Sequence, residues 1–325
     1  MKLSMPLVYA GNPRETADQV VGLEKAGLDL IWVAEPYGFD APTLMGYLAA
    51  KTETVQIGAG ILNVYSRTPG ALLQTAAGIE GFHGLPYDRP LTRTREVIDV
   101  LRMGLRHERL DYQGKTFSVP LPEGQGLGLG KPLKLLNKPE RPSVPLWVAA
   151  LGDKNVAMTA EVADGWLPFL YYPEKAQQVW GEPLARGAAK RSADLAPLEI
   201  CAGGMVAIGE GPETKALLDF MRPMYALYVG GMGARDKNFY NQLACEYGFE
   251  KEAKEIQDLY LSGKKKEAEA LVPLEWLEAG NLVGPESYVK ERIAAFKESG
   301  VTHLSVTPAS DDPAGTIAQI KEWVS

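Results

Sequence analysis

The sequence predicts an α/β fold, a (β/α)8 TIM barrel in which parallel strands alternate with outer helices. Three junctions follow one pattern, in which a helix ends at a glycine and a short apolar strand begins at once. The alternation extends over most of the 325 residues, a common length for a barrel that forms one domain. The three junctions are AGLDLIWV, DGWLPFL and SGVTHLSV.

The composition is that of a globular protein outside the nucleic-acid-binding classes. Apolar residues make up 46% of the chain, enough for a large core. A net charge of −7 argues against nucleic acid and against polybasic contact with a membrane. No apolar run approaches ~20 residues, and the N-terminus MKLSMPLVYA lacks the basic and apolar regions of a signal peptide. We therefore expect a soluble cytoplasmic protein with no membrane or nucleic-acid partner.

The cysteines and histidines do not have the spacings of a metal site. Cys201 and Cys245 are far apart and stand among apolar residues, so we expect structural thiols rather than a disulfide or metal ligands. His83, His107 and His303 lack a partner at the i, i+4 spacing of a helical metal site. No metal is expected.

The clearest strand–helix–strand unit extends from residue 144 to residue 170. The apolar run Leu146 to Ala150 predicts a strand buried on both faces. From Asn155, apolar residues recur at helical spacing until Asp164-Gly165, and Trp166 to Leu170 predicts the next buried strand. The handedness of such units makes the two strands parallel.

The turn between that strand and helix is a candidate ligand site. Ala149, Ala150 and Gly152 have small side chains or none, so a ligand could approach the main chain closely. The free N–H groups at the start of the helix point to the same space, which suits a phosphate. The alternative is that small residues merely ease a tight turn.

Apolar runs and helical periodicity predict the other elements. Before this unit, we expect strands at 2–9, 28–35 and 55–59, and helices at 13–26, 41–51 and 70–79. After it, we expect strands at 198–208, interrupted by Gly203-Gly204, and 302–307, and helices at 173–191, 214–228, 285–299 and 313–324. The charged segments 250–261 and 263–272 predict solvated helices.

The fourth strand of the barrel is missing from the sequence. After residue 79, GFHGLPYDRP contains no strand and leads directly into the amphipathic helix 91–106. Seven strands are thus expected where a closed barrel has eight. Residues 108–119 predict a hairpin with Gln113-Gly114 at its turn, and 120–142 a long loop of the kind that forms lids or binding loops.

Five stretches carry a family resemblance: SRTPGALLQTAAGIE, GFHGLPYDRPLTRTREVIDVLR, GLGKPLKL, VPLWVAALGDKNVAMTAEVADGWLP and GGMGARDKNFYNQLACEYGFE. Together they resemble the luciferase-like monooxygenase superfamily, and most closely its deazaflavin-dependent branch, which uses coenzyme F420. The resemblance extends nearly end to end. It implies one barrel domain over residues 1–325, with insertions at about 108–142 and 230–281, and we expect a homodimer.

The resemblance also implies a cofactor site at the carboxyl ends of the strands. Glu35 resembles the position that faces the reactive edge of the ring, and Ala59-Gly60 the place of a strained bulge behind it. The turn at Ala149 to Gly152 resembles the phosphate-contacting turn, and Phe169 lies at the next strand end. The implied cofactor is F420, with FMN as the alternative, and the implied cofactor-binding residues are Ala59, Gly60, Ala149, Ala150, Leu151, Gly152 and Phe169.

One departure from the family falls at Glu80-Gly81. The family has a glycine-rich loop of the type GRFxLGLGxSGP and the fourth strand here, whereas this sequence joins Glu80 directly to Gly81. Either a strand has been deleted, leaving unpaired edges in the barrel, or residues have been omitted.

Several candidates have a second interpretation. His83 is either an acid, base or substrate contact near the barrel mouth or a surface histidine. Glu35 orients the ring or relays a proton, or else caps the helix that begins near Ala41. We expect His107 to interact with a helix C-terminus and His303 to be structural. The group Arg235, Lys237 and Asn238 either reaches the substrate or the acidic tail of the cofactor, or belongs to an insertion that packs on a neighbouring subunit.

We predict an oxidoreductase that transfers a hydride between F420 and a small organic substrate, with Glu35 and His83 as catalytic candidates. One alternative is an FMN-dependent luciferase-like monooxygenase. Another is a non-catalytic barrel that has lost cofactor binding together with the missing strand. The enzyme prediction requires the turn at Ala149 to Gly152 and the bulge at Ala59-Gly60 to face a common space at one rim.

Overall fold

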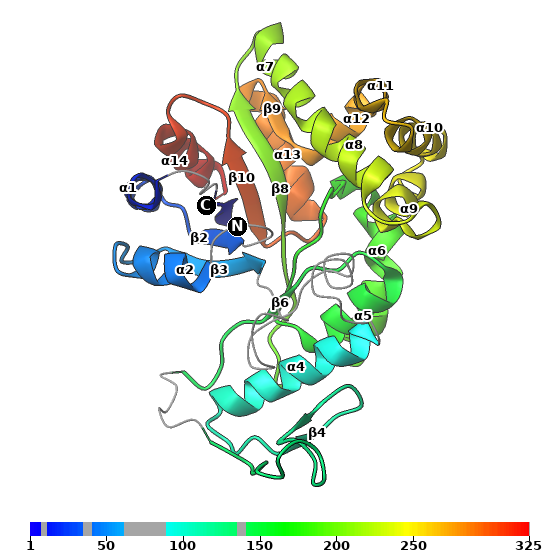
Figure 1. Cartoon of the computed structure of the whole chain (residues 1–325). Coiled ribbons are helices and arrows are strands. Elements are labelled where there is room, and N and C mark those ends of the chain that lie inside the picture. Colours follow the sequence, from blue (N-terminus) through cyan, green and yellow to red (C-terminus); the bar gives the residue numbers. More distant parts are fainter. Residues whose placement is uncertain (8–11, 35–40, 62–88, 135–140, 325) are drawn as a thin grey trace.

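The computed structural model describes residues 1–7, 12–34, 41–61, 89–134 and 141–324. Its centre is an eight-stranded sheet whose paired strands are all parallel, curved as part of a barrel (Figure 1). The strands are β1 (Lys2–Pro6), β2 (Leu30–Ala34), β3 (Gln56–Ile61), β6 (Trp147–Val148), β7 (Gly165–Trp166), β8 (Glu199–Ile208), β9 (Leu282–Gly284) and β10 (His303–Pro308).

The helices cover the outer side of this sheet (Figure 1). None of them, in the ranges just given, has the combination of length and apolar character that a bilayer crossing requires. They are α1 (Pro13–Lys25), α2 (Ala41–Ala49), α4 (Pro90–Leu105), α5 (Asp153–Val162), α6 (Pro173–Ala188), α7 (Pro212–Ala216), α8 (Arg222–Gly231), α9 (Phe239–Glu246), α10 (Glu250–Leu261), α11 (Lys265–Ala270), α12 (Leu274–Gly280), α13 (Glu286–Glu298) and α14 (Pro313–Val324).

The sheet confirms the predicted α/β barrel class and the identity of its seven strands. Their spatial order is β3-β2-β1-β10-β8-β7-β6, which is the order of a barrel without its fourth strand. Strands β3 and β6 flank the position of that strand, and among the described residues neither has a partner on its outer side. The predicted helix 70–79 and the junction Glu80-Gly81 lie outside the described residues.

Several details of the strand prediction are wrong. Strand β6 is half-buried rather than buried on both faces, and within the described ranges β7 is its one strand neighbour. The strand predicted from Trp166 to Leu170 is limited to Gly165–Trp166. Strand β9 was not predicted, since its three residues LVG carry no periodic signal; it pairs with the end of β8.

Strand β8 is continuous through Gly203-Gly204, where an interruption was predicted. Gly203 has φ 151°, and a Cβ there would lie 1.9 Å from the carbonyl oxygen of Ser305 in β10. Gly203 therefore permits close approach of two paired strands, and the pair Gly203-Gly204 does not break β8.

Aromatic side chains fill the barrel interior near the amino ends of the strands. The Trp147 ring packs edge-on against Trp32, with centroids 5.5 Å apart, and against His303, at 5.1 Å. Beside them the Cys201 thiol lies 3.1 Å from the Ser4 hydroxyl, and burial raises the pKa of that thiol to about 11. Neither cysteine forms a disulfide, as predicted.

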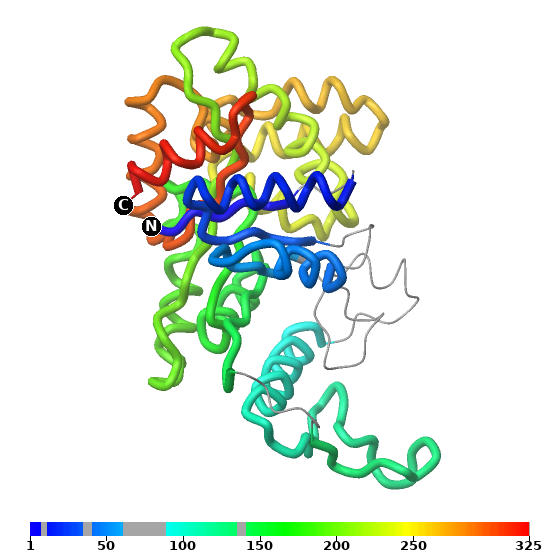
Figure 2. The backbone as a smooth tube through the Cα atoms, turned by 90° about the vertical axis from the view of Figure 1, so that its left-hand side faces the viewer, coloured from blue at the N-terminus to red at the C-terminus, as the bar shows by residue number. Residues whose placement is uncertain are grey.

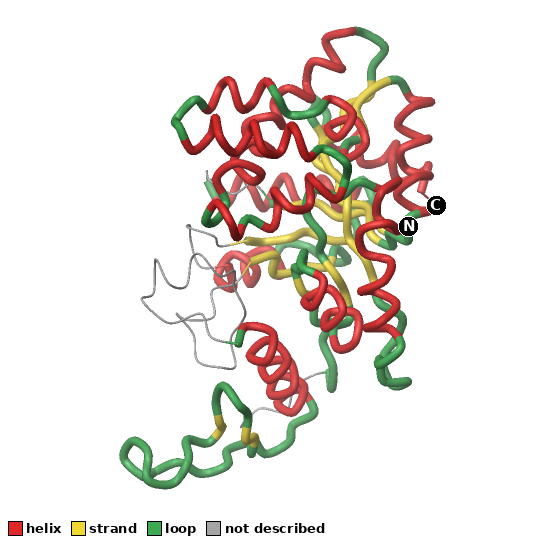
Figure 3. Tube along the Cα trace, turned by 90° about the vertical axis from the view of Figure 1, so that its right-hand side faces the viewer, coloured by secondary structure: helices red, strands yellow, loops and turns green. Residues whose placement is uncertain are grey.

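A protruding lobe carries the predicted hairpin. Helix α4 and the strands β4 (Tyr112–Gln113) and β5 (Ser118–Val119) lie at one end of the molecule, away from the large sheet (Figures 2 and 3). The turn is formed by residues 114–117, so Gln113 belongs to the strand and not to the turn. At the other end, α9, α10 and α11 form a helical layer against α8.

Gly165 makes room for Trp147, since a Cβ there would lie 2.1 Å from Cδ2 of that ring. We expect Gly165→Ala to destabilise the protein by about 1–3 kcal/mol in urea unfolding, because the methyl displaces the ring from both contacts. In the matched control Gly22→Ala, nothing lies within 4 Å of the new Cβ on helix α1, so stability should stay equal or rise by up to about 1 kcal/mol. Equal stabilities of the two variants would contradict this account.

Candidate functional site

The candidate site lies at the carboxyl ends of the parallel strands. Ala59 and Gly60 are near the end of β3, and the turn at Ala149 to Gly152 follows β6 directly. Because all paired strands of the sheet are parallel, these two places lie on the same rim. The shared rim required by the sequence-based argument is therefore present, while a common space between the two places stays a prediction.

Strand β3 contains the predicted bulge. Val33 of β2 pairs with Ala59, whereas the next residue, Ala34, pairs with Ile61. Gly60 is thus the extra residue that has no counterpart in β2. Such a bulge bends the strand and redirects the backbone near the rim.

The barrel interior changes from filled to accessible toward this rim. On β10, His303 at the amino end is 2% exposed, and its pKa is lowered to about 4, mainly by burial. Ser305 and Thr307, on the same face of the strand, are half-buried. His303 is therefore structural, as predicted, and the partly accessible positions are those nearest the candidate site.

Two buried tryptophans fix the turn after β6. The Trp166 indole N–H donates to the carbonyl of Ala150 at 2.9 Å, and the Trp180 indole N–H donates to that of Leu151 at 3.3 Å. These carbonyls point into the core. In the described part of the chain, no group accepts a hydrogen bond from the backbone N–H of Asp153 or of Lys154, at the start of α5. The turn therefore presents donors to a ligand, which suits an anionic group.

An aromatic cluster covers the rim beside this turn. Phe169 lies 4.8 Å from Tyr228 and 6.2 Å from Tyr240, measured between ring centroids. Phe239, the first residue of α9, is 58% exposed, and its Cε1 would lie 3.2 Å from a Cβ at Gly152. No local pattern predicted Tyr228, Phe239 and Tyr240 at this place, because their contacts join α8 and α9 to the strand end near Phe169.

Two of the candidates in the segment 235–238 serve structural roles. Arg235 forms an ion pair with Asp258 of α10. The side chain of Asn238 is buried and caps α9, with Oδ1 accepting from the N–H groups of Tyr240 and Asn241 and Nδ2 donating to carbonyls of α8. Lys237 is exposed. The contacts of Arg235 and Asn238 thus hold the insertion together.

The catalytic candidates Glu35 and His83 both lie outside the described residues. Glu35 follows β2 directly in the sequence. His107 takes the position after the C-cap of α4 with φ 59°, next to the helix C-terminus where it was predicted.

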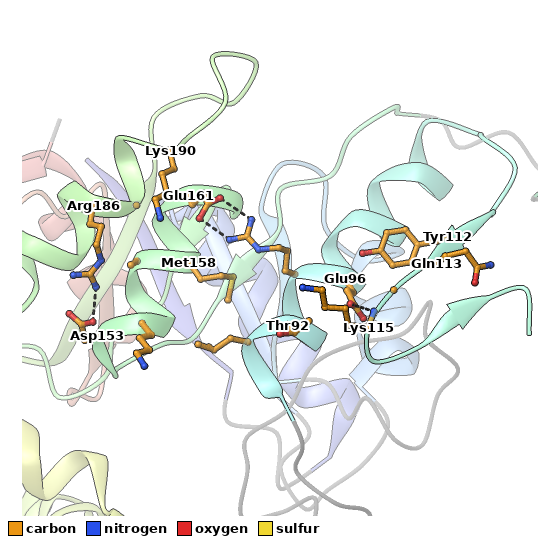
Figure 4. A pocket seen from close by; sticks show the side chains of 16 residues that line it. Thr92, Glu96, Tyr112, Gln113, Lys115, Asp153, Met158, Glu161, Arg186 and Lys190 are labelled. Carbon is orange, nitrogen blue, oxygen red and sulfur yellow. Dashed lines mark hydrogen bonds and ion pairs between the residues drawn. The ribbon is translucent and has the colours of Figure 1, made fainter. Parts of the chain in front are cut away.

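A separate groove lies on the outer side of α5, between α4, α6 and the hairpin (Figure 4). Its volume is about 780 Å³. One end begins at Asp153 and Lys154, immediately after the candidate phosphate turn, and the other reaches Glu96 and Lys115. The groove is lined by Leu91, Thr92, Arg95, Glu96, Tyr112, Gln113, Gly114, Lys115, Asp153, Lys154, Ala157, Met158, Glu161, Arg186, Gly187 and Lys190.

The model of the luciferase-like monooxygenase family matches residues 2–82 and 78–303. The chain belongs to the luciferase-like monooxygenase family. Among its relatives, a putative coenzyme F420-dependent oxidoreductase of Mycobacterium tuberculosis is 33% identical over 346 aligned positions, covering 98% of this chain and 99% of the relative.

Solved structures support the fold. The coenzyme F420-dependent tetrahydromethanopterin reductase of Methanopyrus kandleri superimposes with a TM-score of 0.76 at 19% identity, over 99% of each chain. An F420-dependent secondary alcohol dehydrogenase in complex with an F420-acetone adduct gives a TM-score of 0.70 at 16% identity, over 100% of this chain and 99% of the other.

The family match is divided where the fourth strand is missing. Its two pieces meet at residues 78–82, at the junction Glu80-Gly81. The alignment with the M. tuberculosis relative has 346 positions and this chain has 325 residues, so at least 21 positions (346 − 325) have no counterpart here. A strand and its loop have about that length.

Glu96 joins the hairpin to α4. Its side chain is buried, and its carboxylate accepts from the N–H groups of Lys115, at 2.5 Å, and Thr116, at 3.0 Å, and from the Thr116 hydroxyl. Burial alone would raise the pKa of Glu96, but these hydrogen bonds lower it below its ordinary value of 4.5. Because the folded pKa is depressed, the stabilisation is complete above pH 4.5 and is lost as the pH falls through the folded value.

We expect Glu96→Gln to weaken hairpin docking by about 1–3 kcal/mol, since an amide cannot accept all three hydrogen bonds. Hydrogen exchange at Lys115 and Thr116 should be faster in the variant than in the wild type at about pH 6. The difference should narrow as the pH falls through the lowered folded pKa of Glu96, where the wild-type carboxylate becomes protonated. Glu108→Gln, at an exposed ion pair with Arg106, is the control and should leave both amides unchanged. Equal exchange in wild type and Glu96→Gln at pH 6 would rule out this role.

Proposed function

We propose that the protein is an F420-dependent oxidoreductase that transfers a hydride between the deazaflavin and a small organic substrate. The observation that carries this proposal is the M. tuberculosis relative, which is named as a putative F420-dependent oxidoreductase and aligns over nearly the whole of both chains. The bulge at Gly60 and the donor-rich turn at Gly152 lie on one rim, where a ring and a phosphate of one ligand would be held.

The residues of this rim fit such a cofactor. The half-buried positions Ser305 and Thr307 face the barrel interior and leave it accessible from the rim. Gly60 would let the ring lie against the β3 backbone, and the N–H groups of Asp153 and Lys154 would bind a phosphate. Phe169 and Phe239 would shield the cofactor from water. When bound, the deazaflavin supplies the carbon that accepts or donates the hydride, and the protein supplies position and electrostatics.

Glu35 and His83 complete the proposed site. Glu35 comes directly after β2 in the sequence, and β2 ends at the same rim as β3 and β6. A carboxylate there can orient the ring or move a proton, and an imidazole can act as acid or base at neutral pH. We assign these two roles from the sequence and from the family resemblance.

We also propose that the chain acts as one barrel domain with insertions at about 108–142 and 230–281, in a cytoplasmic homodimer. Four leucines of the segment 120–133 support an interface, because 51% to 91% of each is exposed and exposed apolar patches commonly mark contact surfaces. They are Leu121, Leu127, Leu129 and Leu133.

Titration with oxidised F420 beside FMN tests the proposed function. We expect saturable quenching of F420 fluorescence and weak or absent FMN binding. Tight FMN binding, with oxygen-dependent activity, would support the monooxygenase instead, and no binding of either would support the non-catalytic barrel.

In Gly152→Ala, F420 affinity should fall about tenfold, because the methyl occupies the space of close approach. The thermal midpoint should hardly change, since Gly152 has φ −70° and the neighbouring Phe239 is exposed and can move.

Glu35→Gln should separate chemistry from binding. If Glu35 moves a proton during turnover, kcat should fall by about 10²–10⁴ while F420 affinity changes by less than about threefold. The pH dependence of kcat should also lose its acidic limb. A variant with wild-type kcat over the whole pH range would remove Glu35 from the proposed machinery.

A further inference from the structure

The groove along α5 is cationic, although the chain as a whole is acidic. Five basic and three acidic side chains line it, a local balance of +2 (5 − 3) against −7 for the chain. The basic residues are Arg95, Lys115, Lys154, Arg186 and Lys190, and the acidic ones are Glu96, Asp153 and Glu161.

All three acidic groups already have partners. Arg95 binds Glu161 through two parallel hydrogen bonds of 2.9 and 2.7 Å, and Arg186 binds Asp153 at 2.6 Å. Glu96 accepts hydrogen bonds from the hairpin, as described above. The charges of Glu161 and Asp153 are therefore compensated by arginines, whereas Glu96 keeps its charge among neutral donors.

Three lysines of the groove form no ion pair within the described part of the chain: Lys115, Lys154 and Lys190, of which Lys190 acts on Glu161 only at longer range. All three are exposed. Figure 4 shows Lys190 beside Glu161 on one side of the groove and Lys115 beside Glu96 on the other. Lys154 stands at the start of α5. The positive charge is thus spread along the groove rather than concentrated at one point.

The groove continues from the candidate phosphate turn. Asp153 and Lys154 belong both to the start of α5, with its free N–H groups, and to the groove wall. Between the charged ends, the side chains of Leu91, Ala157 and Met158 provide an apolar lining. A ligand anchored by an anionic group at the turn could extend into this groove without crossing a helix.

We propose that the groove binds an extended ligand that carries several carboxylates or phosphates, with Lys115, Lys154 and Lys190 as its charge partners. Each exposed ion pair contributes little, so one anionic group would not suffice and several spaced groups are required. Two ligands have this chemistry. One is the acidic tail of the cofactor, an assignment that rests on the proposed function, and the other is a separate polyanion. Binding of either ligand should weaken with salt.

The test compares two double variants of the whole chain. Lys115→Gln/Lys190→Gln removes groove charge, preserves side-chain length and leaves Lys154 at the phosphate turn unchanged. Lys251→Gln/Lys297→Gln removes the same charge from exposed positions on α10 and α13 and is the matched control. Both should keep the wild-type thermal midpoint. The probes are F420 with its acidic tail, the same deazaflavin without the tail, tetraglutamate and inorganic tripolyphosphate.

If the cofactor tail occupies the groove, the groove variant should bind tailed F420 about tenfold more weakly than the control at low ionic strength. Both variants should bind the tailless form equally. If a separate polyanion occupies it, only the affinity for tetraglutamate or tripolyphosphate should fall. In both cases the difference should vanish at high salt. If all four probes bind the groove variant and the control alike, the proposal is overturned. Failure of every deazaflavin to bind would reject the proposed function. The two polyanion probes would still show whether the groove binds polyanions.

Discussion

The contact of Trp147 with Trp32 and His303 is the interaction on which the rest of the site depends. Strand β6 is only two residues long and has one strand neighbour among the described residues, so its ladder gives it little support. The Trp147 ring compensates by reaching across the interior to β2 and β10. Because the candidate phosphate turn begins two residues later, its position is determined by this packing and by the glycine at position 165 that makes room for it.

The same dependence on the core extends into the turn itself. Trp166 and Trp180 are almost fully buried, and their indole N–H groups hold the carbonyls of Ala150 and Leu151. A peptide group whose carbonyl is held in the core cannot rotate to present that oxygen to a ligand. The donors at the start of α5 therefore lie in an environment without competing backbone acceptors, which is what anion binding requires. Aromatic packing here sets the electrostatic character of the rim.

The sequence predicted those parts of the structure that carry a local signal. The seven strands of the sheet path, the turn after β6 and the bulge near Gly60 were expected, because glycine-terminated helices, apolar runs and a family resemblance all point to them. Strand β9 and the rim aromatics Phe239 and Tyr240 depend on tertiary contacts that no local pattern encodes. Gly203-Gly204 was misinterpreted for the same reason, since the need for glycine comes from a neighbouring strand and not from a turn. The groove brings together residues up to about 100 positions apart, so the spacing of residues in the sequence could not predict it.

Among the described residues no strand lies between β3 and β6, and these two outer strands have features that reduce the cost of an unpaired edge. An unpaired edge invites association with other chains, and natural sheets counter this with short strands and bulges. Strand β6 has two residues, and β3 is bulged at Gly60. Each edge thus offers few backbone groups in regular register to a foreign strand. These features also flank the proposed cofactor site, with Gly60 on one side and the Gly152 turn on the other. The bulge that protects the edge is therefore also the feature that, in the proposed function, would bring the β3 backbone to the cofactor, so edge protection and the proposed binding favour the same glycine.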